Sequence, residues 1–412
     1  MRTTKSSLIR MAGVLSVLVL LGAAALPSAS AQLIISEFRY RGPNGANDEF
    51  IEIYNNSGAD HTVNSPSSPS TGYGVFASDG MLRCSIPDGT VIPNRGHFLC
   101  INSIGYSLAS YPAGNGTTAI GDATYTLNIP ENVGIALFAT NVAAEVALAN
   151  RMDAVGTTAE ANTLYKEGTG LPTLVGFSID YAWVRDTCGK GGSITTFGPC
   201  PTGGLPKDTN NNASDFYFVD TNGTSAGGGQ RLGAPGPENL SSPIRRNESV
   251  AVSLLDPCVA GASPPNRVRD FTSDPANNST FGTLDVRRTI VNNTGANVTR
   301  LRFRIVDITT FPAPSGIADL RPRTSTDVVV TVDRAPCGSG TSNVLVNGTT
   351  LEQPPSQPNG GGFNSSMSDN DVTLATPLGV TPGVNNTKDV RFLLGIQQNG
   401  SFRFFINVEV LP

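Results

Sequence analysis

The sequence predicts an all-β protein in which two antiparallel β-sandwich domains follow a signal peptide. Short runs of alternating apolar and polar residues recur along the chain, separated by Gly, Pro, Asn and Ser, which is the pattern of antiparallel sandwiches. Glycine and proline contribute 45 and 29 of the 412 residues and interrupt the chain too often for long helices. The N-terminal segment has the charge and apolar pattern of an export signal.

In that segment, Arg2, Lys5 and Arg10 precede an uncharged apolar run at residues 11–26, and the small residues 29–31 follow it. Small side chains suit the cut made by a signal peptidase. A retained membrane anchor is the alternative, but the run is shorter than the roughly 20 apolar residues that span a bilayer. We therefore expect residues 1–31 to be removed and the mature chain to be secreted or held at the cell surface, with no membrane span.

The charge balance bears on the partners. The chain has 28 basic and 33 acidic residues, a formal net charge of -5, and removal of the three basic residues of the signal brings the mature chain to -8. An acidic surface disfavours nucleic acid or an anionic membrane as the main partner. We expect an unknown protein or polysaccharide partner at the cell surface instead.

Six cysteines form an even set, as expected in an oxidising compartment. Two of them flank a turn-like stretch at residues 86–90 and are predicted to staple a hairpin, two bracket a Gly/Thr-rich loop, and elimination pairs the last two. Six cysteines allow fifteen pairings, so this local arrangement is one hypothesis among them. The predicted bridges are Cys84–Cys100, Cys188–Cys200 and Cys258–Cys337.

The domain boundary is predicted at residues 233–243, where prolines and small residues replace any strand pattern. The first domain then covers residues 32–239, a linker covers 240–246, and the second domain covers 247–412. Residues 142–150 are Ala-rich and are predicted to form either a short helix or an extended loop.

The first predicted domain opens with LIISEFRYRG at residues 33–42 and NDEFIEIYN at residues 47–55, which indicate two strands joined by a turn. It contains GTVIPNRGHFL at residues 89–99 and closes with RLGAPGPEN at residues 231–239. These segments resemble the lamin-tail family, in which an Ile-Ser-Glu strand leads to a Glu-Phe-Ile-Glu-Ile strand. Residues 57–80 and 139–173 depart from the family pattern and are expected to be loops or insertions.

The resemblance implies an immunoglobulin-like sandwich of the kind used in animals at the nuclear lamina and in bacteria on exported proteins, where it is thought to tether or to recognise. It brings no catalytic residues to this chain. Because one fold hosts many functions, the resemblance alone fixes no activity.

In the second predicted domain, Leu301, Phe303 and Ile305 alternate with Arg302 and Arg304. A half-buried strand places such apolar side chains on its inner face and the arginines on its outer face. The valine-rich residues 327–333 indicate a more buried strand.

The last two strands show the clearest alternation. A three-residue loop at residues 398–400, with Gly400 supplying a positive φ, is predicted to join them as a hairpin. The register that keeps one face apolar pairs Ile396 with Phe402, Leu394 with Phe404, Phe392 with Ile406 and Val390 with Val408.

One motif has the Gly-x-Ser-x-Gly spacing of a nucleophile elbow, at residues 223–227 around Ser225. An elbow requires a helix after the serine and a histidine later in the chain. Gly228 and Gly229 follow instead, and both histidines precede the serine, so a Gly/Ser-rich loop is favoured.

The titratable side chains offer little sign of catalysis. His61 lies among polar loop residues, and His97 directly precedes an apolar strand, so each is interpreted as a surface or turn residue. Without a Cys-x-x-Cys spacing, two histidines make a zinc site improbable. A hairpin that carries alternating acids is expected to present them as a solvated face; the acids are Glu37, Asp48, Glu49 and Glu52.

A candidate calcium loop lies at residues 208–215, where Asp208, Asn210 and Asn212 place oxygen ligands at alternate positions and Asp215 follows. Calcium prefers several hard oxygens on a flexible loop. The glycine and terminal glutamate of an EF-hand are absent, and Asn/Asp runs also form ordinary turns, so a hydrogen-bonded turn is the alternative. No other cofactor is expected.

The single tryptophan, Trp183, shares one strand face with Tyr181 and Arg185. An exposed face of this composition would form a binding surface for sugar or peptide. Packing of Trp183 in the core is favoured over that alternative.

These observations predict a secreted, non-catalytic binding, tethering or structural protein that acts through its sandwich surfaces, for example by adding a partner strand to a sheet edge. The rival hypotheses are a secreted hydrolase and a carbohydrate-binding adhesin with a calcium loop.

Overall fold

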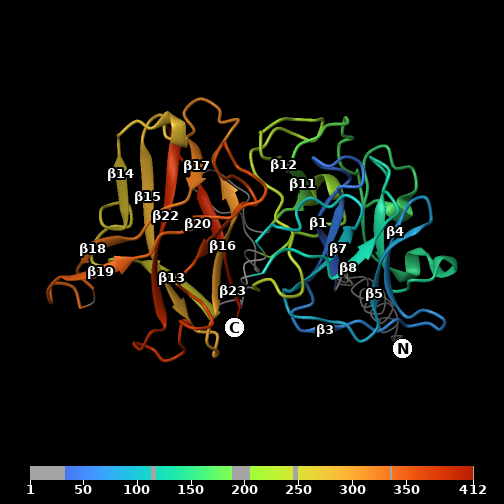
Figure 1. Cartoon of the computed structure of the whole chain (residues 1–412), viewed down its shortest axis with the longest axis horizontal. Helices are drawn as coiled ribbons and strands as arrows, with labels where there is room; N and C mark the ends of the chain where they lie inside the picture. Colours follow the sequence, from blue (N-terminus) through green and yellow to red (C-terminus); the bar gives the residue numbers. More distant parts are fainter. Residues whose placement is uncertain (1–32, 113–116, 188–204, 245–248, 335, 412) are drawn as a thin grey trace, which may run out of the picture. The chain divides into compact units, whose positions relative to one another are not determined.

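The computed structural model describes residues 33–112, 117–187, 205–244, 249–334 and 336–411. The predicted fold class is confirmed: the described chain is an all-β sandwich protein with several antiparallel sheets and only short helical turns. Figure 1 shows the strands of the two halves of the chain. No helix in these ranges is long and apolar enough to cross a membrane.

The first sheet is built on the predicted opening hairpin, which is confirmed. Strands β1 (Leu33–Arg39) and β2 (Phe50–Asn55) pair antiparallel, with a bulge between Ile35 and Glu37. The sheet order is β12-β11-β1-β2-β7-β8, and only the β7–β8 pair is parallel. The remaining strands are β7 (His97–Asn102), β8 (Ala123–Tyr125), β11 (Tyr181–Arg185) and β12 (Phe216–Asp220).

The second sheet has the order β10-β9-β4-β5 and draws two strands from stretches that we expected to be loops. Its strands are β4 (Gly72–Ala77), β5 (Leu82–Pro87), β9 (Ile135–Phe138) and β10 (Arg151–Val155). The glycines of β4 disguise it in the sequence, and Gly74 is required by space: a Cβ there would lie 2.8 Å from the carbonyl oxygen of Thr140. A short pair, β3 (His61–Thr62) with β6 (Val91–Ile92), completes this half.

The core of the first half lies between these two sheets, because alternate residues of each strand face it. Ile35, Ile51 and Ile53 contribute from the first sheet, and Val75 and Leu137 from the second. The predicted Cys84–Cys100 disulfide is present, but it does not staple a hairpin: Cys84 lies in β5 and Cys100 in β7, so it joins the two sheets.

Residues 142–150 form neither an α-helix nor a simple extended loop. They contain two single 3₁₀ turns, η1 (Ala143–Glu145) and η2 (Leu148–Asn150). The other short turns are η3 (Thr163–Tyr165), α2 (Asn212–Asp215) and η5 (Pro275–Asn277).

The second half contains a five-stranded sheet of order β13-β15-β22-β17, in which β14 also pairs with β15, and a four-stranded sheet of order β20-β21-β16-β23. The strands of the larger sheet are β13 (Val250–Leu254), β14 (Arg267–Asp270), β15 (Thr283–Asn292), β17 (Asp319–Arg323) and β22 (Thr387–Gln398). Those of the smaller sheet are β16 (Arg300–Ile308), β20 (Thr350–Leu351), β21 (Ser366–Asp369) and β23 (Phe404–Leu411).

The predicted C-terminal hairpin is wrong. Strand β22 pairs with β15 and β17, whereas β23 pairs with β16, so the connection at residues 399–403 crosses from one sheet to the other. The apolar faces were assigned correctly: Phe392 and Phe404 face each other across the core, with ring centroids 5.9 Å apart. Alternation identifies the buried face of a strand. It does not say whether a second strand is hydrogen-bonded to it in the same sheet or packs against it from the opposite sheet.

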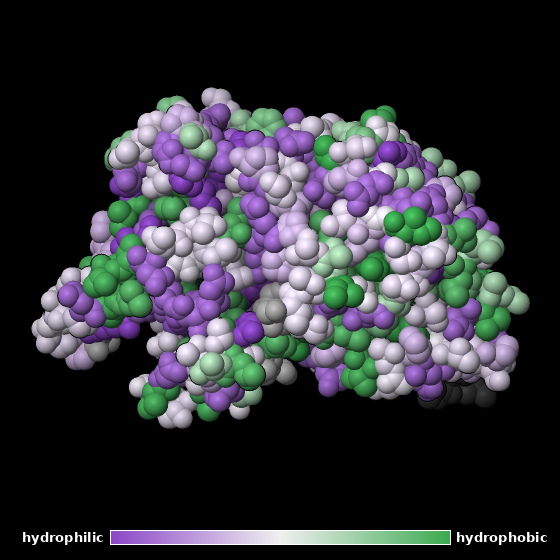
Figure 2. Space-filling view, in the orientation of Figure 1, coloured by the Kyte–Doolittle hydropathy of each residue, from purple (hydrophilic) through white to green (hydrophobic). Residues whose placement is uncertain are grey.

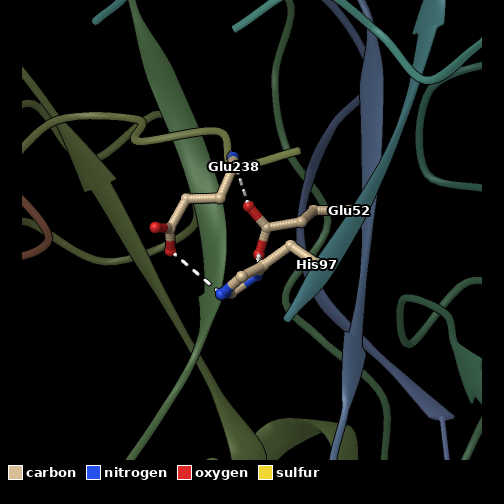
Figure 3. A group of neighbouring side chains, drawn as sticks. All are labelled: Glu52, His97 and Glu238. Atoms are coloured by element: carbon tan, nitrogen blue, oxygen red, sulfur yellow. Dashed lines mark hydrogen bonds and ion pairs between the residues drawn. The ribbon is translucent and has the colours of Figure 1, made fainter. Parts of the chain in front are cut away.

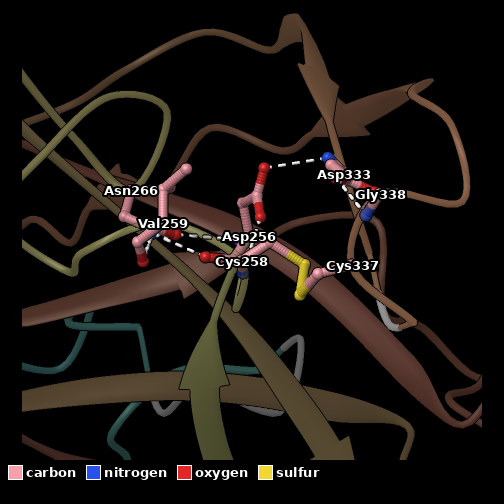
Figure 4. The surroundings of a disulfide bond; sticks show 7 residues. All are labelled: Asp256, Cys258, Val259, Asn266, Asp333, Cys337 and Gly338. Atoms are coloured by element: carbon pink, nitrogen blue, oxygen red, sulfur yellow. Dashed lines mark hydrogen bonds between the residues drawn. A yellow bond between two sulfur atoms is a disulfide. The ribbon is translucent and has the colours of Figure 1, made fainter.

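The valine-rich residues form β18 (Val328–Val332), which pairs only with β19 (Ser342–Val346) among the described strands. Val330 and Val332 are buried, but Val329 is 70 % exposed, so the strand is less buried than predicted. The Cys258–Cys337 disulfide confirms the third predicted pair (Figure 4). Beside it, the Asp256 carboxylate accepts hydrogen bonds from the backbone N–H groups of Cys258 and Asp333. The predicted Cys188–Cys200 bridge lies outside the described residues.

Each of the larger sheets draws its described strands from one side of the predicted boundary. Residues 32–412 nevertheless form one compact unit, and the segment expected to separate two domains is packed. Gly233 forms a bridge with Phe363, and Ile244 forms one with Val410. The proposed division at residues 240–246 stays a prediction.

Candidate functional site

Glu52, His97 and Glu238 meet at one buried point (Figure 3). Glu52 lies on β2 between Ile51 and Ile53, which face the core, so its own side chain points to the other face of the sheet. His97 begins the neighbouring strand β7, and Glu238 follows β12 in the segment that covers this face. His97 is 9 % exposed, so the prediction of a surface or turn residue is wrong.

The imidazole lies between two carboxylates. Its Nδ1 is 3.0 Å from Glu52 Oε1, and its Nε2 is 3.2 Å from Glu238 Oε2. The other Glu52 oxygen, Oε2, accepts a hydrogen bond of 2.7 Å from the backbone N–H of Glu238. Both ring nitrogens and both Glu52 oxygens are therefore engaged.

Two arginines of β16 complete the cluster. Arg302 contacts Glu238 Oε1 through Nη2 and donates from Nε to Glu409 Oε2 at 2.7 Å. Arg304 lies 3.1 Å from Glu238 Oε2 and 3.4 Å from Glu409 Oε1. Both guanidinium groups are buried, contrary to the predicted outer strand face, because the segment around Glu238 and strand β23 lie against them. We call Glu37, Glu52, His97, Glu238, Arg302, Arg304 and Glu409 the buried charge cluster.

Electrostatics fix the protonation of His97. Burial lowers the pKa of its imidazole, but the negative charges of Glu238 and Glu52 outweigh burial and raise the pKa to about 9. At neutral pH the ring is thus an imidazolium that donates from both nitrogens. Such a ring has no lone pair with which to accept a proton, so it cannot act as a general base there.

Glu37 adds little negative charge to the cluster. Burial, aided by the charge of Glu52, raises the pKa of Glu37 to about 8, so this carboxyl is mostly protonated at neutral pH. It accepts hydrogen bonds from the backbone N–H of Gly236 and from Asn364 Nδ2. The expectation that Glu37, Asp48, Glu49 and Glu52 form a solvated face is wrong, since all four are at most 3 % exposed.

The cluster borders a cavity of about 100 Å³, which has room for a few water molecules. Ser36 is the hydroxyl closest to the role of a nucleophile, but its Oγ donates to Glu52 Oε1 at 2.5 Å. In a histidine-activated serine the imidazole takes the hydroxyl proton, and the His97 imidazolium has no free lone pair for it. A metal ion fits poorly, because a histidine ligand must be neutral whereas His97 holds protons on both ring nitrogens.

The side chains of the predicted calcium loop contact different groups and do not converge on one point. Asn212 Oδ1 accepts hydrogen bonds from the backbone N–H groups of Gly156 and Glu167, so both of its lone pairs are used. Asp215 Oδ2 accepts from the N–H groups of Thr209 and Asn211. These two side chains shape the turn, as the hydrogen-bonded alternative predicts.

Asp208 and Asn210 lie elsewhere in that loop. Asp208 belongs to a separate carboxylate group with Asp153 and Glu167, and Asn210 lines a surface pocket beside Glu167. Calcium binding stays a prediction, with Asp208 as the member of the predicted set that meets other carboxylates.

Tyr181, Trp183 and Arg185 do not form an exposed binding surface. Their exposed fractions are 0, 1 and 3 %, and the two aromatic rings pack against Phe218 in the core. Arg185 donates to Asp153 Oδ2 at 2.5 Å and to the backbone carbonyl of Ile35. Core packing, the favoured alternative, is what the structure shows for Trp183.

The residues that sequence reasoning missed share one feature. Glu52, Arg302 and Arg304 each alternate with buried apolar residues in a strand. The sequence therefore predicts on which face of the strand they lie, but not that another segment packs over that face. A polar residue of the strand is buried when a distant segment packs over it, and the local pattern carries no signal of that segment.

Comparison of the chain with protein-family models, with curated proteins and with solved structures found no match in any of the three.

Proposed function

We propose that the protein is an exported, non-catalytic binding or tethering protein that acts through the surfaces of its β-sandwiches. The observation that carries this proposal is the state of His97. Both of its nitrogens are bound by carboxylates, and its raised pKa keeps it protonated at neutral pH, which suits a structural ion pair and opposes general-base chemistry.

The surface is the remaining place for function. Figure 2 shows hydrophilic and hydrophobic side chains interspersed on one face, with a hydrophobic area over the β18–β19 ribbon. Val329 and Leu345 face each other across that ribbon and are 70 % and 53 % exposed. Contact surfaces of binding modules combine such apolar groups with a polar rim. The resemblance of residues 33–239 to lamin-tail domains is part of the same proposal, since it implies tethering or recognition.

The test has an export arm and an activity arm. In the source cells, we expect the protein in the medium or at the cell surface, with Gln32 as its N-terminal residue. We expect labelled mature protein to bind isolated cell envelopes saturably. Wild-type protein and His97→Gln should show the same background rates on model ester, glycoside, peptide and phosphoester substrates.

A substrate that the wild type turns over and His97→Gln does not would overturn the proposal in favour of the hydrolase. Intracellular protein that retains residues 1–31 would overturn its export. Absence of saturable envelope binding would remove the tethering function.

A further inference from the structure

A second group of carboxylates lies outside the buried charge cluster. Asp153 comes from β10, Glu167 follows η3, and Asp208 precedes α2. One oxygen from each lies within 4.8 Å of the other two. Calcium binds oxygens at about 2.3–2.6 Å, so ligands on opposite sides of one ion lie up to about 5 Å apart. The separation of these three oxygens therefore fits a single ion.

Glu167 supplies an independent sign of a missing ligand. Its side chain is buried, and the residue is 6 % exposed. Oε1 faces Arg151 Nη2 at 3.2 Å, but the buried Oε2 accepts no hydrogen bond from any residue in the described ranges. A buried carboxylate oxygen without a partner is unfavourable by itself and points to a bound cation or proton.

The charges around the group leave room for a cation. Arg185 donates to Asp153 and lies 3.5 Å from Asp208 Oδ1 and 3.8 Å from Asp215 Oδ2. Arg151 lies against Glu167, so two guanidinium groups face four carboxyl groups. The carboxyl groups outnumber the guanidinium groups, so a divalent cation would meet an excess of negative charge.

The group reaches solvent at Glu167. Of the three carboxylates, Glu167 alone lines a surface pocket of about 320 Å³, together with Arg151, Lys166 and Asn210. Calcium commonly keeps water molecules among its six to eight oxygen ligands, and the pocket can hold them on the side that the protein leaves open.

We propose that Asp153, Glu167 and Asp208 bind one calcium ion, approached through the pocket beside Asn210. All three side chains offer hard oxygen ligands, as calcium requires. This set keeps Asp208 from the loop predicted by the sequence but replaces Asn212 and Asp215, whose side-chain oxygens each already accept two hydrogen bonds. Asp153 keeps an acceptor position: its Oδ2 accepts from Ile35 N–H and Arg185, but within the described part of the chain its Oδ1 accepts only from the backbone N–H of Ala154. The inference is independent of whether the protein is catalytic.

The test is calorimetric titration of CaCl₂ into mature protein previously treated with chelator and dialysed. For the wild type we expect one site with a Kd of about 10⁻⁴ to 10⁻³ M, the range of extracellular calcium modules. Glu167→Gln keeps the shape of the side chain but removes its charge, and should raise the Kd about tenfold or more. Glu131→Gln, which alters a partly exposed carboxylate paired with Arg41, is the control and should leave the Kd unchanged.

Absence of binding by the wild type at millimolar calcium would overturn the proposal. Wild-type affinity in Glu167→Gln would also overturn it and would return the site to the loop at residues 208–215. Circular dichroism in chelator checks that the variant is folded. If Glu167→Gln does not fold, Asp208→Asn replaces it, and unchanged affinity in that variant would contradict the proposal equally.

Discussion

Arg302 shows what a buried charge requires of its neighbours. Its guanidinium is fully buried and contacts both Glu238 and Glu409. Removal of a charge from water costs several kcal/mol, which only well-placed opposite charges and hydrogen bonds offset. Loss of the Arg302 side chain would therefore leave the buried carboxylates of Glu238 and Glu409 with less positive charge beside them.

We predict that Arg302→Met lowers the free energy of unfolding by about 3–5 kcal/mol, the cost of breaking a buried ion pair on one side. Arg300→Met is the matched control, because Arg300 lies on the same strand but is partly exposed and donates to the backbone carbonyl of Thr299. It should cost under about 0.5 kcal/mol. Urea denaturation at neutral pH measures the free energy of unfolding of both variants. Equal decreases would show that the ion pairs of Arg302 stabilise the fold no more than the contacts of Arg300 do.

At this scale the sequence predicts the strand face but not its environment. The alternation of Leu301, Arg302 and Phe303 correctly places the apolar residues in the core. The partner of Arg302, Glu238, is 64 residues away, and only the tertiary structure brings it near. The same limit applies to His97 and Glu167, whose charged partners come from distant segments that the local pattern does not reveal.

The last two strands illustrate the element scale. Phe392 on β22 is 1 % exposed and packs edge-on against Phe303 of the opposite sheet, with ring centroids 4.9 Å apart. Leu393, the next residue, points to the other face and is only partly buried. Of these two neighbouring residues, Phe392 therefore lies in the packed core and Leu393 lies on a partly solvated surface.

We expect Phe392→Ala to destabilise the protein by about 3–5 kcal/mol, because it removes a large buried side chain and leaves a cavity. Leu393→Ala should cost about 1 kcal/mol, since that side chain is partly solvated. Thermal or chemical unfolding of the two variants gives the comparison. A larger loss for Leu393→Ala would reverse the assignment of the faces.

Among elements, the opening hairpin was predicted correctly from two runs of alternating residues joined by the connection at residues 40–49. The C-terminal hairpin was predicted wrongly although its strands alternate equally well. In both cases the pattern identifies the strands, but sheet membership depends on which distant strands take the edge hydrogen bonds, here β15 and β17 for β22 and β16 for β23. Strand β4 was missed because its glycines resemble a loop.

On the scale of the whole molecule, the all-β fold and two disulfides follow from composition and spacing. The contacts between the two halves do not follow from composition or spacing. The buried charge cluster links β2 and β7 to the segment around Glu238 and to β16 and β23. These links come from residues spread between positions 37 and 409, and no local pattern connects them.

The cluster makes stability depend on pH. The pKa of His97 in the folded protein, about 9, lies above its ordinary value of 6.5. A raised folded-state pKa contributes stability that is fully present below pH 6.5 and is lost as the pH rises through about 9. The ion pairs of His97 therefore favour the folded state across the neutral range.

The most direct test of the central claim, that His97 is a structural imidazolium and not a base, is an NMR titration of ¹⁵N-labelled histidine in the folded mature protein. The chain has two histidines, and His61→Gln assigns the signals. We predict that both ring nitrogens of His97 stay protonated through neutral pH, with a midpoint near pH 9, while burial keeps the pKa of His61 below its ordinary 6.5. A His97 midpoint at or below 6.5 would contradict the account, because a neutral imidazole beside Glu52 could accept a proton.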